Sequence, residues 1–173
     1  MPGVHLNLLG HEQAEQLALR LKGMEIAALY ASPLERATET AAPLARARKL
    51  PVHVSEAMTE LDYGEWTGQN IDDLEEQPAW RRFNSHRSVT RIAGGENMLE
   101  VQSRAVMELD RLRERYDGST VAIVSHCDVI RCAVVHYLGM AIDLFQRIEI
   151  SPASVTTVDL AEWGPCIRAL NSL

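Results

Sequence analysis

The sequence lacks several features that mark whole classes of protein. Among its 173 residues there is no apolar run long enough for a membrane-spanning helix, and only 5% of the residues are aromatic. The three cysteines are an odd number without paired spacing, so they suggest neither a disulfide framework nor a zinc site. The formal net charge of −7 comes without a basic stripe, which argues against a nucleic-acid partner. We therefore expect no membrane segment, no nucleic acid and no bound metal.

The remaining composition is that of an ordinary globular enzyme or binding domain. Hydrophobic residues make up 46% of the chain and charged residues 24%, without repeats or linkers. The length favours one domain, residues 1–173, that can bury a hydrophobic core without stabilising disulfides or metal ions. No basic region followed by an apolar block opens the chain, which together with the cysteine usage predicts a cytoplasmic location. An acidic protein can still hold a small basic pocket, so a small anionic substrate is compatible with the charge.

The most informative stretch is residues 121–131, VAIVSHCDVIR. Its apolar, β-branched start predicts a buried strand at residues 121–125, and the periodicity of residues 129–138 predicts a helix directly after the turn. His126 would then stand at the carboxyl end of a strand, beside a helix N-terminus whose free N–H groups suit an anion. The alternative is a buried histidine that is satisfied by a backbone carbonyl.

Helices alternate with strands along most of the chain, which predicts a parallel, doubly wound sheet with helices on its faces. An antiparallel hairpin near the end would add an edge to this sheet. The predicted helices are residues 8–21, 33–48, 71–84, 99–116 and 129–138, and the predicted strands are residues 26–31, 52–54, 121–125, 148–150, 154–160 and 163–170.

Arg36 is a second candidate for anion binding. Ser32 and Glu35 are spaced as a capping box, with Pro33 at the first helical position, so we expect a helix to start here. A cation in the first turn of a helix opposes the macrodipole, which is better explained if an anion binds there too. The alternative is that Arg36 pairs with a nearby carboxylate, Glu39 or Glu60.

Residues 56–68, EAMTELDYGEWTG, predict neither helix nor strand. They combine carboxylates with Tyr63 and Trp66, and long irregular loops in compact domains are often functional. Burial against these rings would raise the pKa of a carboxyl group, which suits a general acid, and Glu60 is the candidate. A solvated acidic loop whose aromatic residues plug the core is the alternative. Together, Arg36, His126 and Glu60 could bind a phosphate and protonate a leaving oxygen, as in phosphoryl transfer from a phosphoester.

Four segments in order resemble the histidine phosphatase family, which also contains the cofactor-dependent phosphoglycerate mutases and the α-ribazole phosphatases. They are SPLERATETA (32–41), ELDYGEWTG (60–68), GGE (94–96) and VSHCDVIR (124–131), and LNLLGHEQAEQLALRL (6–21) is similar to the family's first helix. The resemblance covers essentially the whole chain. It implies a three-layer α/β fold with a mostly parallel, doubly wound sheet.

By the same resemblance, the chain would be a phosphatase that needs no cofactor and acts on a small phosphomonoester through a phosphohistidine. Arg36 matches the phosphate-binding arginine, Glu60 the proton donor, and His126 the second histidine of the phosphate pocket. Cys127 would join Arg36 and His126 in lining the substrate site. Residues 76–94 would form the lid, whose arginines either favour anionic substrates or form a solvated charged face; these are Arg81, Arg82, Arg87 and Arg91.

The chain departs from the family in two places. Nothing matches the first strand and its Arg-His-Gly motif, which carries the family's nucleophile, so we expect that the first strand is missing and that this form is truncated and impaired or inactive. Cys127 and Asp128 stand where the family usually has glycine, which alters the pocket floor. Without the first strand, residues 27–31 and 121–125 would have unpaired edges. We therefore expect the sheet to close up, or an association to fill the gap, which leaves a homo-oligomer open.

Two other functions compete with the phosphatase. One is a catalytically inactive relic that binds a phosphorylated ligand or a partner through Arg36 and His126. The other is a cysteine phosphatase with Cys127 as its nucleophile. That chemistry needs a glycine-containing loop that reaches an arginine six residues on, but position 133 is alanine and Arg131 comes too early. We therefore expect Cys127 to be a packing residue at a helix start.

Overall fold

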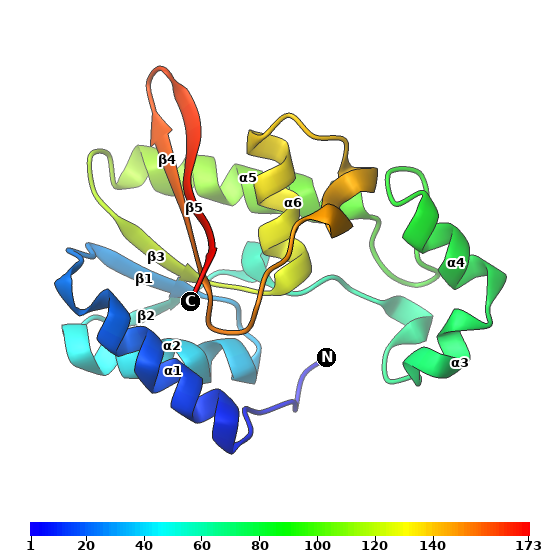
Figure 1. Ribbon diagram of the computed structural model, residues 1–173, viewed down its shortest axis with the longest axis horizontal. Helices are drawn as coiled ribbons and strands as arrows, with labels where there is room; N and C mark the ends of the chain where they lie inside the picture. Colours follow the sequence, from blue (N-terminus) through cyan, green and yellow to red (C-terminus); the bar gives the residue numbers. More distant parts are fainter.

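The computed structural model describes residues 1–173 as a three-layer α/β fold beside a separate hairpin (Figure 1). A three-stranded parallel sheet has the order β2-β1-β3, where β1 is Ala28–Ala31, β2 is Val52–Val54 and β3 is Val121–Val124. The predicted parallel α/β architecture is therefore confirmed. The hairpin consists of β4 (Val155–Ala161) and β5 (Gly164–Ser172), which pair with each other and form a sheet of their own. The expectation that this hairpin adds an edge to the parallel sheet is therefore wrong. None of the helices is long and apolar enough to span a bilayer.

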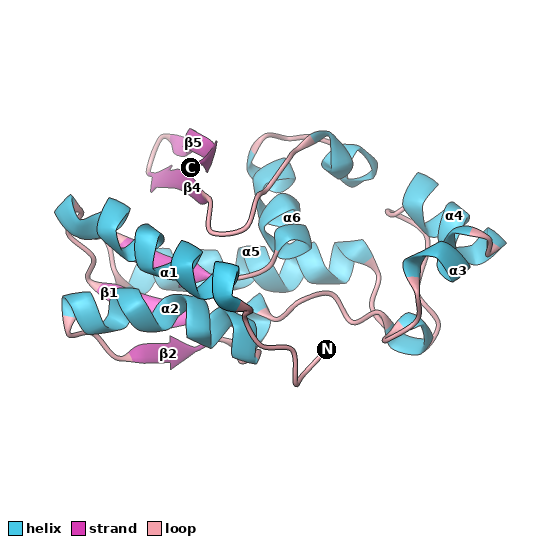
Figure 2. Ribbon diagram, turned by 60° about the horizontal axis from the view of Figure 1, so that its bottom comes forward, coloured by secondary structure: helices cyan, strands magenta, loops and turns pink.

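Alternate residues of β1 point toward opposite faces of the sheet, and helices cover both faces (Figure 2). Leu29 and Ala31 pack with the helices α1 (Leu8–Arg20) and α2 (Glu35–Arg48). Ala28 and Tyr30 point the other way, toward Leu112 of α5 (Met98–Arg115). This alternation is the period of two that a strand imposes, and it explains why all four residues of β1 are buried. The largest core cluster lies between α5, α6 (Cys127–Tyr137) and the irregular segments that cover them.

Several helix ends follow from local sequence. Asn7 caps α1 by accepting a hydrogen bond from the Gly10 N–H at 2.8 Å. Asn97 and Glu100 form a reciprocal capping box that starts α5. The helix expected over residues 71–84 is wrong as a single element. It is divided into α3 (Ile71–Glu75) and α4 (Pro78–Ser85), because Pro78 cannot continue a helix from before it.

Other expectations on individual elements are also corrected. The helix of residues 33–48 begins two residues late, at Glu35, with Leu34 as its N-cap. The Ser32 hydroxyl group accepts a hydrogen bond from the Leu34 N–H at 3.3 Å and lies 2.7 Å from His126 Nε2, so it caps no N–H group of the helix itself. The strand expected at residues 148–150 is absent. The backbone carbonyls of Ile148 and Ile150 instead accept hydrogen bonds from the Arg131 and Cys127 side chains of α6. Short 3₁₀ turns complete the chain: η1 (Leu21–Gly23), η2 (Glu56–Met58), η3 (Gly64–Trp66) and η4 (Ile142–Arg147).

The gap in the sheet lies in a different place from the one expected. β1 and β3 pair directly, with Leu29 opposite Ala122, so residues 27–31 have no unpaired edge toward residues 121–125. A groove of about 970 Å³ instead lies between β3 and β4, lined mainly by apolar side chains. The expectation that the sheet closes up is therefore wrong for this chain. Each bordering strand already has one paired edge, and the helices along the groove are held by cores of their own.

Candidate active site

The site begins where β1 and β3 end side by side. Ala31 is opposite Val124 in the ladder, so the residues that follow these strands, Ser32 and His126, are neighbours. The His126 Nε2 atom lies 2.7 Å from the Ser32 Oγ atom. His126 is buried and occupies the N-cap position of α6 in an extended conformation, without a side-chain capping bond. The predicted position of this histidine, at a strand end and a helix N-terminus, is confirmed.

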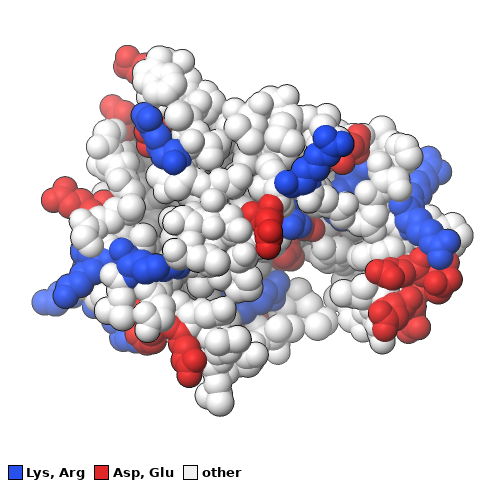
Figure 3. Space-filling model, in the orientation of Figure 1, with Lys and Arg blue, Asp and Glu red and all other residues white.

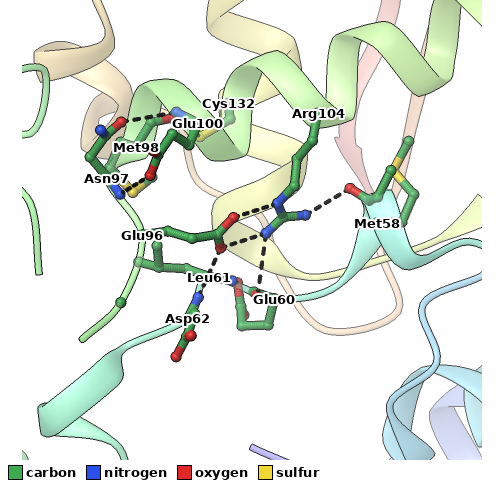
Figure 4. A network of polar contacts seen from close by, with 12 residues as sticks. Met58, Glu60, Leu61, Asp62, Glu96, Asn97, Met98, Glu100, Arg104 and Cys132 are labelled. Carbon is green, nitrogen blue, oxygen red and sulfur yellow. Dashed lines mark hydrogen bonds and ion pairs between the residues drawn. The ribbon is translucent and has the colours of Figure 1, made fainter.

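Glu60 approaches His126 from the irregular loop before η3. Its Oε1 atom accepts a hydrogen bond from the Leu61 N–H at 2.9 Å, and its Oε2 atom lies 4.0 Å from His126 Nδ1. Arg104 of α5 fixes the surrounding backbone (Figure 4). The Arg104 guanidinium pairs with Glu96 at 2.8 Å and donates to the carbonyl oxygens of Ala57 at 2.7 Å and Glu60 at 3.4 Å.

Burial sets the protonation of both groups. It raises the pKa of Glu60 to about 7, and the charge of Asp128 contributes to the rise. Burial lowers the pKa of His126 to about 4, with the Arg36 charge acting in the same direction. The 4.0 Å contact is therefore no ion pair near neutral pH, because His126 is neutral there and Glu60 is largely protonated below pH 7. The expectation that desolvation raises the pKa of Glu60 is confirmed.

Arg36 lies in the first turn of α2, within electrostatic reach of Glu60 and His126. Its Nη1 atom donates to the backbone carbonyl of Met1 at 3.1 Å. Glu39, an alternative partner for Arg36, instead contacts His5 Nδ1 at 2.5 Å and the Leu6 N–H at 2.8 Å. The structure thus brings the three predicted residues close enough for their charges to interact, near the N-termini of α2 and α6. Their roles in catalysis stay predictions.

Cys127 lies at the first position of α6, and its thiol points toward the carbonyl oxygen of Ile150, with a sulfur–oxygen distance of 3.5 Å. Burial raises the pKa of this thiol, which keeps it protonated and weakens it as a nucleophile. This geometry favours packing at the helix start over cysteine chemistry. Contact of Cys127 with substrate stays a prediction.

The segment predicted to be the lid contains α4 and stands apart from the sheet (Figure 1). Trp66 stacks edge-on against Trp80 and Phe83 and thereby attaches this segment to the Glu60 loop. Its arginines have different surroundings. Arg87 is buried between the rings of Phe83 and Phe145, at 4.4 and 4.3 Å from their centroids. Arg81 and Arg91 instead form exposed ion pairs with Glu76 and Glu100.

Acidic and basic side chains gather at the outer end of this segment, over α3 and α4 (Figure 3). A hollow separates them from the body of the molecule in the same view.

Sequence reasoning did not identify two residues that shape the site. Ser32 was interpreted as a helix cap, and Arg104 carries no signal on a helix where charged residues are common. Glu96, the partner of Arg104, appeared in the sequence only as part of the GGE segment at residues 94–96, without an assigned role.

The comparisons with known proteins agree with this geometry. The family model described as "Histidine phosphatase superfamily (branch 1)" matches residues 1–173. This chain belongs to that superfamily. It is 30% identical over 164 residues to phosphoserine phosphatase 1 of Hydrogenobacter thermophilus, covering 94% of this chain and 78% of the relative. It is 33% identical over 159 residues to the probable phosphoglycerate mutase GpmB of Escherichia coli, covering 91% and 74%.

A solved structure shows the same fold. The crystal structure of a phosphoserine phosphatase mutant from Entamoeba histolytica, in complex with phosphoserine, superposes with a TM-score of 0.86. The identity is 25%, and the match covers 97% of this chain and 84% of that one. The predicted family and fold are therefore confirmed, and the relatives are phosphatases and mutase-like proteins.

Proposed function

We propose that this domain is a phosphatase that hydrolyses small phosphomonoesters through a phosphohistidine. The observation that carries the proposal is the arrangement of Arg36 and neutral His126 after the ends of β1 and β3, with protonated Glu60 of the irregular loop 4.0 Å from His126. Arg36 and the N-terminus of α6 would bind the phosphate oxygens. His126 would donate a hydrogen bond to the phosphoryl group as it transfers. The name of the Hydrogenobacter relative makes phosphoserine the first substrate to test.

In the proposed first step, the ester P–O bond breaks, a P–N bond forms to a nucleophilic histidine, and Glu60 gives its proton to the leaving oxygen. In the second step a water molecule attacks the phosphorus atom, the Glu60 carboxylate takes a proton from that water, and the P–N bond breaks to release phosphate. A Glu60 pKa of about 7 suits both directions, because the carboxyl group must donate and then accept at one pH.

We further propose that the active form carries the nucleophile on a strand joined to the amino side of Met1. A strand in the groove between β3 and β4 would have its carboxyl end beside His126 if it ran parallel to β3. Met1 lies at that end, since its carbonyl oxygen contacts Arg36. The in-frame DNA upstream of Met1 tests this directly. It should encode an apolar segment ending in Arg-His-Gly, and an immediate stop codon would contradict the proposal.

Activity assays test the proposed chemistry. Both the 173-residue protein and a form extended by the upstream codons would be assayed with phosphoserine and p-nitrophenyl phosphate. We expect the extended form to turn over substrate, and we expect Arg36→Ala and His126→Ala to lower its kcat/KM by roughly 10²- to 10³-fold. Arg46→Ala, a charge change at an exposed position in the last turn of the same helix as Arg36, is the matched control and should leave kcat/KM unchanged. An extended enzyme indifferent to His126→Ala would overturn the assignment.

The alternative is an inactive domain that binds a phosphorylated ligand or a partner. The observation that favours it is that Arg36 and His126 are placed to bind a phosphate, while no histidine in a position to act as nucleophile lies beside them in this chain. Titration of the 173-residue protein with inorganic phosphate, followed by ³¹P NMR, should then show binding that Arg36→Ala removes, without turnover. Turnover by this form, well above background and abolished by His126→Ala, would rule the alternative out.

A cytoplasmic location is part of the main proposal, because the three unpaired thiols suit a reducing compartment.

A further inference from the structure

Asp128 is a buried acid that the proposed chemistry does not use. It is the second residue of α6, two positions after His126, and only 9% of its surface is exposed. Three side chains from different parts of the chain converge on its carboxylate. The Tyr63 O–H donates to Oδ2 at 3.1 Å, Arg131 Nη1 donates to Oδ1 at 3.4 Å, and Arg87 Nη1 lies 3.8 Å from Oδ2. Such a cluster, together with the helix N-terminus, compensates the cost of burying a charge.

This cluster is joined to the proton-donor loop. The loop residues 60–63 meet residues 126–128 at both ends, because Glu60 contacts His126 at 4.0 Å and Tyr63 bonds to Asp128 at 3.1 Å. Two carboxyl groups therefore lie on facing segments of the same buried cluster. Like charges at close range in a low-dielectric site disfavour each other's ionised form.

We propose that Asp128 is a positioning residue for the proton donor. Asp128 holds the loop through Tyr63 and keeps Glu60 in its protonated form. The inference rests on the proposed function only in calling Glu60 the proton donor. The coupling between the two carboxyl groups can be measured whether or not the domain turns over substrate.

Other groups also face Glu60 and must be weighed. Arg36 and the amino group of Met1 favour the ionised form, and His126 is neutral at neutral pH. Arg104 contacts the Glu60 backbone carbonyl, and the Tyr63 O–H joins the loop to Asp128 of α6. Arg87 and Arg131 partly compensate the charge of Asp128. Burial and Asp128 are the two largest influences, and both favour the acid.

The test is a titration of the Glu60 carboxyl carbon by ¹³C NMR, with the resonance assigned by its loss in Glu60→Gln. In the unchanged protein we expect a midpoint of about 7. Asp128→Asn keeps the shape and an acceptor for Tyr63 but removes the charge, so the midpoint should fall by about one unit. Asp73→Asn on exposed α3 removes the same charge far from the cluster and is the matched control. A midpoint that Asp128→Asn leaves within about 0.3 units of the control contradicts the inference.

A second variant changes the midpoint in the opposite direction and keeps the test decisive if Asp128→Asn fails to fold. Arg131→Gln removes a compensating charge from Asp128, so the Glu60 midpoint should rise by about half a unit. A fall or no change would overturn the inference. In the extended, active form, the basic limb of the kcat/KM profile should move with the NMR midpoint, and Asp128→Glu should restore it. A moved midpoint without phosphatase activity would reject the proposed function and leave the inference standing.

Discussion

Gly64 and Gly95 mark a contact between two chain segments that leaves no room for a side chain. A Cβ atom on Gly64 would lie 2.2 Å from the Ala93 carbonyl oxygen, and one on Gly95 would lie 2.3 Å from the Asp62 carbonyl oxygen. Backbone hydrogen bonds join the same segments, with the Glu96 N–H donating to the Asp62 carbonyl at 3.1 Å. The short GGE motif is therefore the backbone clamp that holds the loop carrying Glu60.

At this residue scale we expect Gly64→Ala to destabilise the protein by about 2–4 kcal/mol, because it combines a backbone clash with a φ of 48°. Urea unfolding followed by circular dichroism would measure the change. Gly23→Ala is the matched control, since a Cβ atom there meets nothing within 4 Å. The control should lie within about 1 kcal/mol of the unchanged protein. Equal effects of the two substitutions would contradict the proposed clamp.

At the scale of the element, β3 is an edge strand with one paired and one open side. The Ser32 N–H donates to the Val124 carbonyl at 2.9 Å, so the backbone N–H and C=O groups of Val124 and Ala122 point toward β1. The backbone groups of Val121 and Ile123 point toward the groove. We expect the amide hydrogens of Val121 and Ile123 to exchange with solvent at least about tenfold faster than those of Ala122 and Val124. Hydrogen exchange followed by NMR measures this. Uniform protection along β3 in the 173-residue protein would show that something covers its open edge.

At the scale of the whole molecule, the two buried titrating groups make stability depend on pH in opposite ways. The pKa of Glu60 is raised to about 7, so the stability that it contributes is present below its ordinary value of 4.5 and lost as pH rises through 7. The pKa of His126 is lowered to about 4, so its contribution is present above 6.5 and lost as pH falls through 4.

The Glu60 contribution can be isolated by substitution. Between pH 5 and pH 8, Glu60→Gln should gain up to about 3 kcal/mol of stability relative to the unchanged protein, because glutamine cannot ionise in the buried site. Urea unfolding of both proteins at several pH values in this range checks the prediction. A difference in unfolding free energy that stays constant from pH 5 to pH 8 would mean that Glu60 titrates normally in the folded protein.

Elements that depend on neighbouring residues could be predicted, and elements that depend on distant ones could not. Asn7 and Pro78 act within one helical turn, so the start of α1 follows from sequence and the break after α3 could have been read from it as well. Ser32 has the spacing of a helix cap, yet its hydroxyl group contacts His126, 94 positions away in the chain. A local pattern cannot reveal a competing partner that only the ladder between β1 and β3 brings near.

The sequence by itself determined the kinds of element, the family, and the three residues that meet at the strand ends. Periodicity and turn chemistry are local, and parallel strands carry their following residues to one edge of the sheet. Only the tertiary structure decided the position of the open groove and the protonation states of Glu60 and His126. Strand pairing and desolvation depend on groups that are far apart along the chain, and folding alone brings them together.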